Sequence, residues 1–415
     1  MHISRDRFAE PVVLWALSLL PLTFVFPSRL TALPYIVLLM VATHALFSHA
    51  GARRRYAAFA PVALAFGMYF PYSLASIWLQ HGTLKAADNG LHFLFFLVIA
   101  ICFAELRSQR LFWRGLSAAA WATCALALYQ RFGLHIDRPY GMYGINALRL
   151  SGSIKFGMVA TVFTLLALLA ALDRRIAVPD RVWHGSAALA GYAGCLAIGS
   201  RGPLLALLII SMGLAAGKIS RLHKKQRGRA TLAALLGAAL LAALFHAEIV
   251  ELITLTGADI STMRSGNLET SIGQRLVMWK AALTMFAAHP WFGVGMNQFG
   301  SHLHVLIAAG QAPAYVAVFG HTHNEYLEAL ATGGIIGLAY LLWLFGAPLA
   351  FFLRHLAHRP ADGDPIAALG GLITVLCFAF FAIGDNIFDR QMTTSLLAFL
   401  TLGFAVMTTN PQAEP

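Results

Sequence analysis

The chain has 415 residues, of which 59% are hydrophobic and 12% are charged. This composition is outside the range of ordinary soluble domains and typical of polytopic membrane proteins. The net charge of +12 at pH 7 does not indicate nucleic-acid binding, because the basic residues form short clusters between apolar runs of membrane-spanning length. The four cysteines lie in apolar runs at unrelated spacings, which indicates neither a disulfide framework nor a thiolate metal site.

The amino-terminal segment MHISRDR precedes an apolar run without a small-residue cleavage site, which predicts a retained first span. A span needs about 20 mostly apolar residues, and by this measure the sequence predicts about 12 spans. We therefore expect an all-α polytopic integral membrane protein in which residues 1–415 form a single membrane domain. The expected spans are 11–27, 30–49, 57–80, 90–104, 115–133, 153–172, 183–199, 202–219, 231–248, 327–352, 365–384 and 393–409.

The distribution of Lys and Arg predicts the orientation of these spans. With the amino terminus inside, most of the 30 Lys and Arg residues fall in inner loops, including the cluster KISRLHKKQRGR at 218–229. Positive residues concentrate on the cytoplasmic side of membrane proteins. Both termini are therefore expected in the cytoplasm, and the basic cluster is interpreted as a topology anchor that contacts membrane lipids.

One long segment, residues 249–326, interrupts the pattern of short loops between the ninth and tenth spans, on the outer side. Long loops carried by a rigid scaffold are where function is most often found, so we expect this segment to be catalytic and periplasmic. The part SIGQRLVMWKAALTMFAAHP predicts a helix, with Ser271 and Gln274 as a capping box and Pro290 as its stop.

The apolar residues of that helix predict its surroundings. Leu276, Trp279, Leu283 and Phe286 recur at helical spacing, and few polar residues oppose them. Such a helix is expected to lie against the bundle or in the membrane interface.

Two arginines stand on the outer side, where topology does not require positive charge. Arg275 lies in the first turns of the helix just described, where its planar guanidinium is suited to phosphate oxygens. Arg201 lies in the very short turn GSRGPLL, in which Gly202 is expected to free the backbone and Pro203 suits a helix start. The alternative for both is anchoring in the membrane interface.

The stretch GHTHNEYLEALATGG, residues 320–334, places two histidines before an apolar helix. The spacing of Thr322 and Glu325 is that of a capping box, which predicts a helix start near His323 and an imidazole beside the positive end of the helix dipole. That environment favours the neutral ring, which can accept a proton from an attacking hydroxyl. The alternative is an interfacial histidine bonded to backbone or water. The residues expected to assist His323 or contact substrate are His321, Asn324, Glu325 and Tyr326.

The glycines of the same stretch, at positions 333, 334 and 337, are expected to permit close helix packing just inside the membrane.

Two metal patterns are present but not favoured. His302 and His304 share the His-x-His spacing of His321 and His323, yet the spacing is common and no cysteine joins it. The DGD at 362–364 is interpreted as a solvated turn in an inner loop. We expect neither a metal nor another cofactor, and no hydrolase, P-loop or dinucleotide motif is found.

Three stretches together resemble the O-antigen ligase and polymerase superfamily of bacterial envelope glycosyltransferases. They are SRG at 200–202, the R-x-x-x-W of Arg275 to Trp279 continuing to HPWFGVGMNQF at 289–299, and HNEYLEALATGGIIGL at 323–338. Their order and the long outer loop also fit that family. The resemblance covers about half of the chain in detail and the remainder through topology.

The resemblance implies a metal-independent transferase at the periplasmic face of the inner membrane of a Gram-negative bacterium. The implied donor is a glycan on undecaprenyl pyrophosphate, and in ligases of lipopolysaccharide biosynthesis the acceptor is a lipid A core sugar. Arg201 and Arg275 match the family's two functional arginines, and His323 matches its histidine. Direct displacement by this machinery would invert the anomeric centre. Further basic residues expected to contact phosphates, which the family motifs do not specify, are Arg138, Arg149, Lys155 and Arg264.

Other functions share parts of this pattern. An O-antigen polymerase or a protein O-oligosaccharyltransferase of the same superfamily would carry the same three motifs and differ in the acceptor. A lipid or glycan transporter would also have about 12 spans, but the sequence has no inverted repeat and little charge within spans. The ligase is the favoured interpretation.

Overall fold

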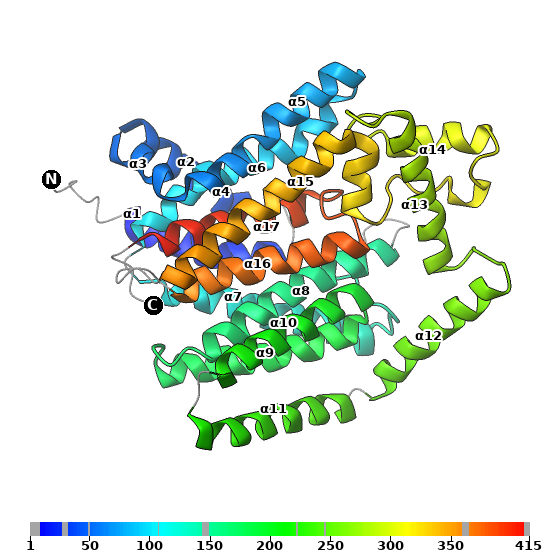
Figure 1. Cartoon of the computed structure of the whole chain (residues 1–415). Helices are drawn as coiled ribbons and strands as arrows, with labels where there is room; N and C mark the ends of the chain where they lie inside the picture. Colours follow the sequence, from blue (N-terminus) through cyan, green and yellow to red (C-terminus); the bar gives the residue numbers. More distant parts are fainter. Residues whose placement is uncertain are drawn as a thin grey trace.

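The computed structural model of the chain describes residues 9–26, 32–48, 50–106, 108–142, 149–220, 223–244, 246–358 and 365–410. Every regular element in these ranges is a helix, which confirms the predicted all-α class (Figure 1). The DGD pattern at 362–364 lies outside the described residues. The α-helices are α1 (Ala9–Thr23), α2 (Ala32–Ser48), α3 (Ala50–Arg55), α4 (Ala60–Gly67), α5 (Tyr69–Gln80), α6 (Asp88–Ile99), α7 (Arg110–Leu128), α8 (Arg149–Ala171), α9 (Val178–Ile198), α10 (Arg201–Ser220), α11 (Lys224–Leu244), α12 (His246–Arg264), α13 (Ser271–Ala288), α14 (Phe299–Ala308), α15 (Glu325–His358), α16 (Pro365–Gly384) and α17 (Gln391–Thr408).

The protein is a multi-pass membrane protein. Eight helical stretches in the described residues are long and apolar enough to cross a membrane, and each coincides with an expected span. They are Tyr56–Gln80, Leu84–Ala104, Arg110–Gly133, Gly152–Ala171, Arg201–Ser220, Glu325–His358, Pro365–Gly384 and Gln391–Thr408. Helices α1 and α2 match the first two expected spans but have only 15 and 17 residues. Helices α9 and α11 overlap two more expected spans but are not among the eight.

Helix α8 lies at the centre of the bundle, packed against α7, α9, α10 and α16. Its residues from Phe156 to Ala170 are almost all buried, as expected of a helix that is apolar on every side. Helix α17 packs on α6 and α16 and completes the core. The amino end of α1 and the carboxyl end of α17 lie at one end of this bundle, and α13 and α14 lie at the other (Figure 1).

Helix α13 confirms the helix expected within residues 249–326 and corrects its details. Thr270, not Ser271, is its cap, since the Thr270 side chain accepts the backbone N–H of Gly273 at 3.1 Å. Its buried face carries Met278 and Met285 with the alanines between them, and packs against α15. Leu276 and Leu283 of the predicted apolar stripe are 42% and 49% exposed, which suits the membrane interface, whereas Trp279 of the same stripe contacts the protein through its indole N–H.

Helix α15 is kinked at Gly334, which has φ 63° and ψ −156°. The kink frees backbone groups of α15, and the loop after α13 satisfies them: Val294 N–H donates to the Ala331 carbonyl at 2.9 Å, and Ile335 N–H donates to the Pro290 carbonyl at 2.8 Å. The HPWFGVG stretch and the glycines of α15 are therefore one interlocked unit. Gly333 and Gly337 also permit the close approach of α5, as the sequence predicts, because a Cβ at either would meet the Tyr72 hydroxyl.

Replacing Gly334 with alanine is expected to destabilise the protein by about 1–3 kcal/mol. The positive φ disfavours a side chain, and the added Cβ would lie 2.4 Å from the Trp291 backbone. Thermal unfolding of the purified protein measures the effect. Gly346→Ala is the matched control, since it lies in the same helix with nothing within 4 Å of its added Cβ. Equal melting temperatures for the two variants would contradict the role of the kink.

Candidate functional site

His323 lies in the loop that leads into α15, at a left-handed backbone position with φ 53°. The helix begins at Glu325, and its cap is Asn324, whose Oδ1 accepts the Leu327 N–H at 3.0 Å. The predicted capping box of Thr322 and Glu325 is therefore wrong. Glu328 makes the reciprocal bond instead, accepting the Thr322 N–H at 2.9 Å.

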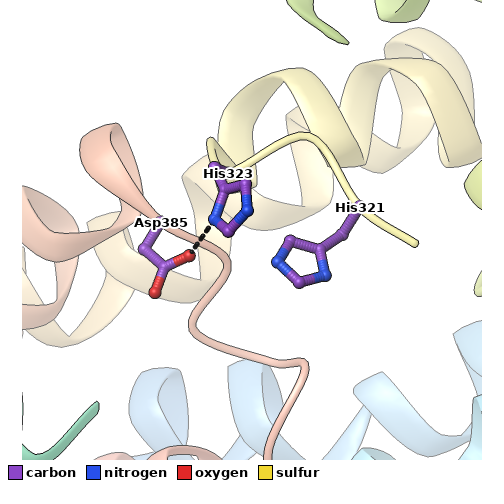
Figure 2. Close-up of side chains that lie close together, drawn as sticks. All are labelled: His321, His323 and Asp385. Atoms are coloured by element: carbon purple, nitrogen blue, oxygen red, sulfur yellow. Dashed lines mark hydrogen bonds and ion pairs between the residues drawn. The ribbon is translucent and has the colours of Figure 1, made fainter. Parts of the chain in front are cut away.

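A carboxylate orients the His323 ring. Asp385, in the loop between α16 and α17, accepts a hydrogen bond from Nδ1 of His323, with 2.8 Å between Nδ1 and Oδ1 (Figure 2). Because the carboxylate can only accept, the proton of the neutral ring lies on Nδ1 and the lone pair on Nε2. From the sequence, we expected the helix dipole to favour the neutral ring. The structure shows a carboxylate that selects the tautomer and stabilises the imidazolium formed when Nε2 takes a proton.

Asp385 is held ionised by a buried lysine. The Lys155 ammonium lies 3.0 Å from Oδ2 of Asp385 and 2.7 Å from Oδ1 of Asp389, and its side chain is 1% exposed. Burial raises the pKa of the Asp385 carboxyl, but Lys155 and the hydrogen bond from His323 outweigh it, and the pKa lies well below its usual range. The expected phosphate contact of Lys155 is corrected accordingly, because its ammonium is enclosed by carboxylates.

His321 lies beside His323, with 4.4 Å between the ring centroids (Figure 2). Burial, helped by the neighbouring His323, lowers the pKa of His321 to about 4, so the ring is neutral at neutral pH. Its buried Nε2 has no hydrogen-bond partner among the described residues. Such an atom is costly to leave unsatisfied.

The R-x-x-x-W pair lies on one side of α13, one turn apart. Trp279 Nε1–H donates to the Thr322 carbonyl at 3.1 Å, which fixes the loop carrying His323. Burial lowers the pKa of Arg275, the charge of Asp385 raises it, and the charge of Arg201 lowers it. Arg275 therefore shares one electrostatic environment with Asp385 and Arg201, and as a guanidinium it remains a cation at neutral pH.

Arg201 is the first residue of α10, at the short turn that the sequence predicts. Gly199, with φ 66°, ends α9, and Ser200 Oγ donates to the Ser153 carbonyl of α8 at 2.9 Å. The expectation that Gly202 frees the backbone is wrong, since Gly199 takes the left-handed conformation. The Arg201 guanidinium contacts Oδ2 of Asp259 on α12 at 3.2 Å.

Three residues expected to assist His323 or bind sugar hydroxyls instead hold the start of α15 to α16 and to the loop after α16. Asn324 is the cap of α15, and its Nδ2 donates to the Ile383 carbonyl at 3.0 Å. Glu325 is 6% exposed, and its Oε2 accepts the Ile387 N–H at 2.8 Å. Tyr326 donates its hydroxyl to the Ala379 carbonyl at 2.9 Å. These contacts position Asp385 relative to His323 and leave the three side chains little capacity for substrate.

No contact in the described part of the chain places the other predicted basic residues in the site. Arg138 is exposed, and its carbonyl accepts a bond from Ser153 Oγ at 3.0 Å. Arg264 is exposed at the last turn of α12. Arg149 begins α8, but its side chain lies outside the described residues. Their contacts with phosphates stay predictions.

His321, His323 and Asp385 could geometrically hold a metal ion, since their ligand atoms lie within 4.8 Å of one another. The surroundings do not fit a divalent cation, because the Lys155 ammonium and the Arg275 charge act on the same carboxylate. His323 Nδ1 and Asp385 Oδ1 are also already bonded to each other. His302 and His304, on α14, do not belong to this cluster, so the four-histidine pattern considered from the sequence is not assembled.

Sequence reasoning missed Asp385 and Asp259. A signal for Asp385 existed, because Asp385, Asn386 and Asp389 are polar residues in a short loop between two apolar runs. Asp259 lies in a segment without a motif, and only its contact with Arg201 distinguishes it.

Comparisons with known proteins give the family that this chain resembles. A family model described as "O-Antigen ligase" matches residues 185–342, which include Arg201, Arg275 and His323. An uncharacterized protein of Haemophilus influenzae is 24% identical over 329 residues, which are 76% of this chain and 78% of the relative. The O-antigen ligase of Escherichia coli is 27% identical over 131 residues, which are 31% of this chain and 29% of that ligase. The similarity thus spans less than a third of the Escherichia coli protein.

Proposed function

We propose that this chain, which belongs to the O-antigen ligase superfamily, transfers a glycan from undecaprenyl pyrophosphate to a lipid A core sugar. Membership indicates a ligase- or polymerase-type activity in O-antigen or glycan processing, and the donor, acceptor and mechanism are our proposal. The observation that carries it is the pairing of His323 with Asp385 in the same electrostatic environment as Arg275 and Arg201. A base and two guanidiniums are the groups that transfer from a lipid diphosphate requires.

The proposed reaction forms one glycosidic bond and breaks one anomeric bond to phosphate. The acceptor hydroxyl gives its proton to Nε2 of His323, and its oxygen attacks the anomeric carbon of the donor. The bond between that carbon and the diphosphate oxygen breaks, and undecaprenyl pyrophosphate leaves with the electron pair. Asp385 stabilises the imidazolium through Nδ1–H. A direct displacement of this kind inverts the anomeric configuration.

Arg201 and Arg275 are the proposed ligands of the diphosphate. Guanidiniums bind phosphate oxygens in pairs and stabilise the negative charge that grows on the leaving group. A diphosphate leaving group needs no general acid, so these side chains and His323 suffice without a metal. His321, with its unpartnered Nε2, is proposed to bond a substrate oxygen beside the base.

We propose that the site faces the periplasm and that both termini are cytoplasmic. The charge distribution of the sequence supports this orientation. The arrangement of the bundle also supports it, because α13 and the loop of His323 lie at the end opposite the start of α1 and the end of α17 (Figure 1). The donor and acceptor lipids would then both reach the site from the outer leaflet of the inner membrane.

Deleting the gene and profiling lipopolysaccharide tests the proposal. We expect rough lipopolysaccharide with accumulation of lipid-linked polymer, restored by the intact gene. Single-repeat caps would instead identify a polymerase, and unchanged lipopolysaccharide with lost protein glycans would identify a protein glycosyltransferase. In proteoliposomes with purified donor and acceptor, substrate flux without new glycosidic bonds would indicate a transporter. A product that retains the donor's anomeric configuration would exclude direct displacement.

A further inference from the structure

Helix α12 is held differently from the helices of the bundle. It lies at the edge of the molecule, between α11 and α13, and packs mainly on these two neighbours in the chain (Figure 1). Its apolar side chains Val250, Ile253 and Ile260 are exposed. Few buried contacts therefore fix its position, which is typical of segments that move.

Two ion pairs connect α12 to the bundle in the part of the chain that the structure describes. Glu251 pairs with Arg131, in the turn after α7, at 3.3 Å. Asp259 pairs with Arg201 at 3.2 Å. The side chains of Arg201 and Asp259 are 31% and 21% exposed, so this second pair is open enough to exchange partners.

Asp259 also acts on Arg275. Burial is the largest effect and lowers the pKa of Arg275, while the charge of Asp259 raises it together with that of Asp385. The Asp259 carboxylate thus occupies the electrostatic environment of both arginines to which the proposed function assigns the diphosphate. Carboxylate and phosphate oxygens bind a guanidinium in the same geometry, so they compete for it.

We propose that Asp259 fills the anion site of the donor-free protein and that the donor's diphosphate displaces it from Arg201. Displacement removes one of the two ion pairs that connect α12 to the bundle, so donor binding is coupled to release of this helix. This inference rests on the proposed function of Arg201 and Arg275. Competition with Asp259 would also make the site selective for diphosphates over lipid monophosphates, because a diphosphate carries more charge and competes better with a carboxylate.

Pyrophosphate binding to the purified full-length protein tests the displacement. Inorganic pyrophosphate is titrated without divalent metals, and Asp259→Asn is expected to bind it about five- to tenfold more tightly than the unaltered chain. A purely structural role of Asp259 would not produce tighter binding. Glu251→Gln is the matched control, since it removes the other ion pair of α12 away from the anion site, and it should tighten binding less than Asp259→Asn does. Equal affinity in Asp259→Asn, or equal tightening in Glu251→Gln, would overturn the proposal.

Spin-label distances test the release of α12. Cysteines replace Ile253 on α12 and Leu205 on α10, which are 67% and 50% exposed, and the four native cysteines are buried. Pyrophosphate should broaden or lengthen the distance between the labels, and Asp259→Asn should do so without it. An unchanged distance would exclude release.

The alanine variants of Arg201 and Arg275 distinguish a failure of the proposed anion site from a failure of the proposed displacement. If neither weakens pyrophosphate binding, the proposed anion site itself is wrong. If both weaken it and Asp259→Asn does not tighten it, only the displacement fails.

Discussion

Replacing His323 with alanine is expected to abolish glycan transfer, with a loss of at least about 10²- to 10⁴-fold in kcat. The acceptor hydroxyl then lacks the base at Nε2, while the diphosphate ligands remain in place. Transfer from purified lipid-linked donor measures the loss, and pyrophosphate binding should be unchanged. His304→Ala, which alters an exposed histidine of α14, is the control for expression and insertion. Retained transfer in the His323 variant would show that His323 is not the base.

Asp385→Asn tests the role of the orientation and tautomer of the His323 ring while the ring itself stays in place. An asparagine can present its amide N–H to Nδ1, which favours the wrong tautomer, with the proton on Nε2. We expect a large loss of kcat with little change in donor KM, because the asparagine keeps the shape of the loop. A variant that lost donor binding and kcat in equal measure would indicate that Asp385 only maintains the fold.

Replacing Arg275 with alanine is expected to lower kcat by about 10²- to 10³-fold and to weaken pyrophosphate binding. The guanidinium stabilises charge that appears on the leaving diphosphate, so its removal affects the transition state more than the bound donor. Arg275→Lys should recover part of the activity, since the ammonium keeps the charge but loses the bidentate geometry.

Lys280→Ala is the matched control for Arg275→Ala. Lys280 lies in the same helix, is exposed, and makes no contact with His323 or Arg201 among those of the described residues. Its transfer rate should match that of the unaltered chain. Equal losses of transfer rate in the two variants would show a general sensitivity of α13 to substitution. They would contradict the assignment of Arg275 as a ligand of the diphosphate.

The helices and the three proposed principal site residues could be predicted from the sequence because their signals are local. An apolar run of spanning length is required wherever a helix crosses the bilayer, and short motifs marked Arg201, Arg275 and His323. Helix caps were less predictable. Thr322 competes with Asn324 as the cap of α15, and Ser271 competes with Thr270 as the cap of α13. In each case the two candidates lie within one turn, and the contacts of the neighbouring loop decide between them.

What the sequence alone determined is thus a multi-pass helical protein, for which Arg201, Arg275 and His323 are the predicted principal site residues. Only the tertiary structure decided that Asp385, 62 residues from His323, orients its ring, and that Lys155 serves this carboxylate and not a phosphate. It also placed Asp259 on Arg201, 58 residues away. The physical reason is that periodicity and hydropathy act over a few turns of chain, whereas the partner of a charged side chain is set by how distant helices pack.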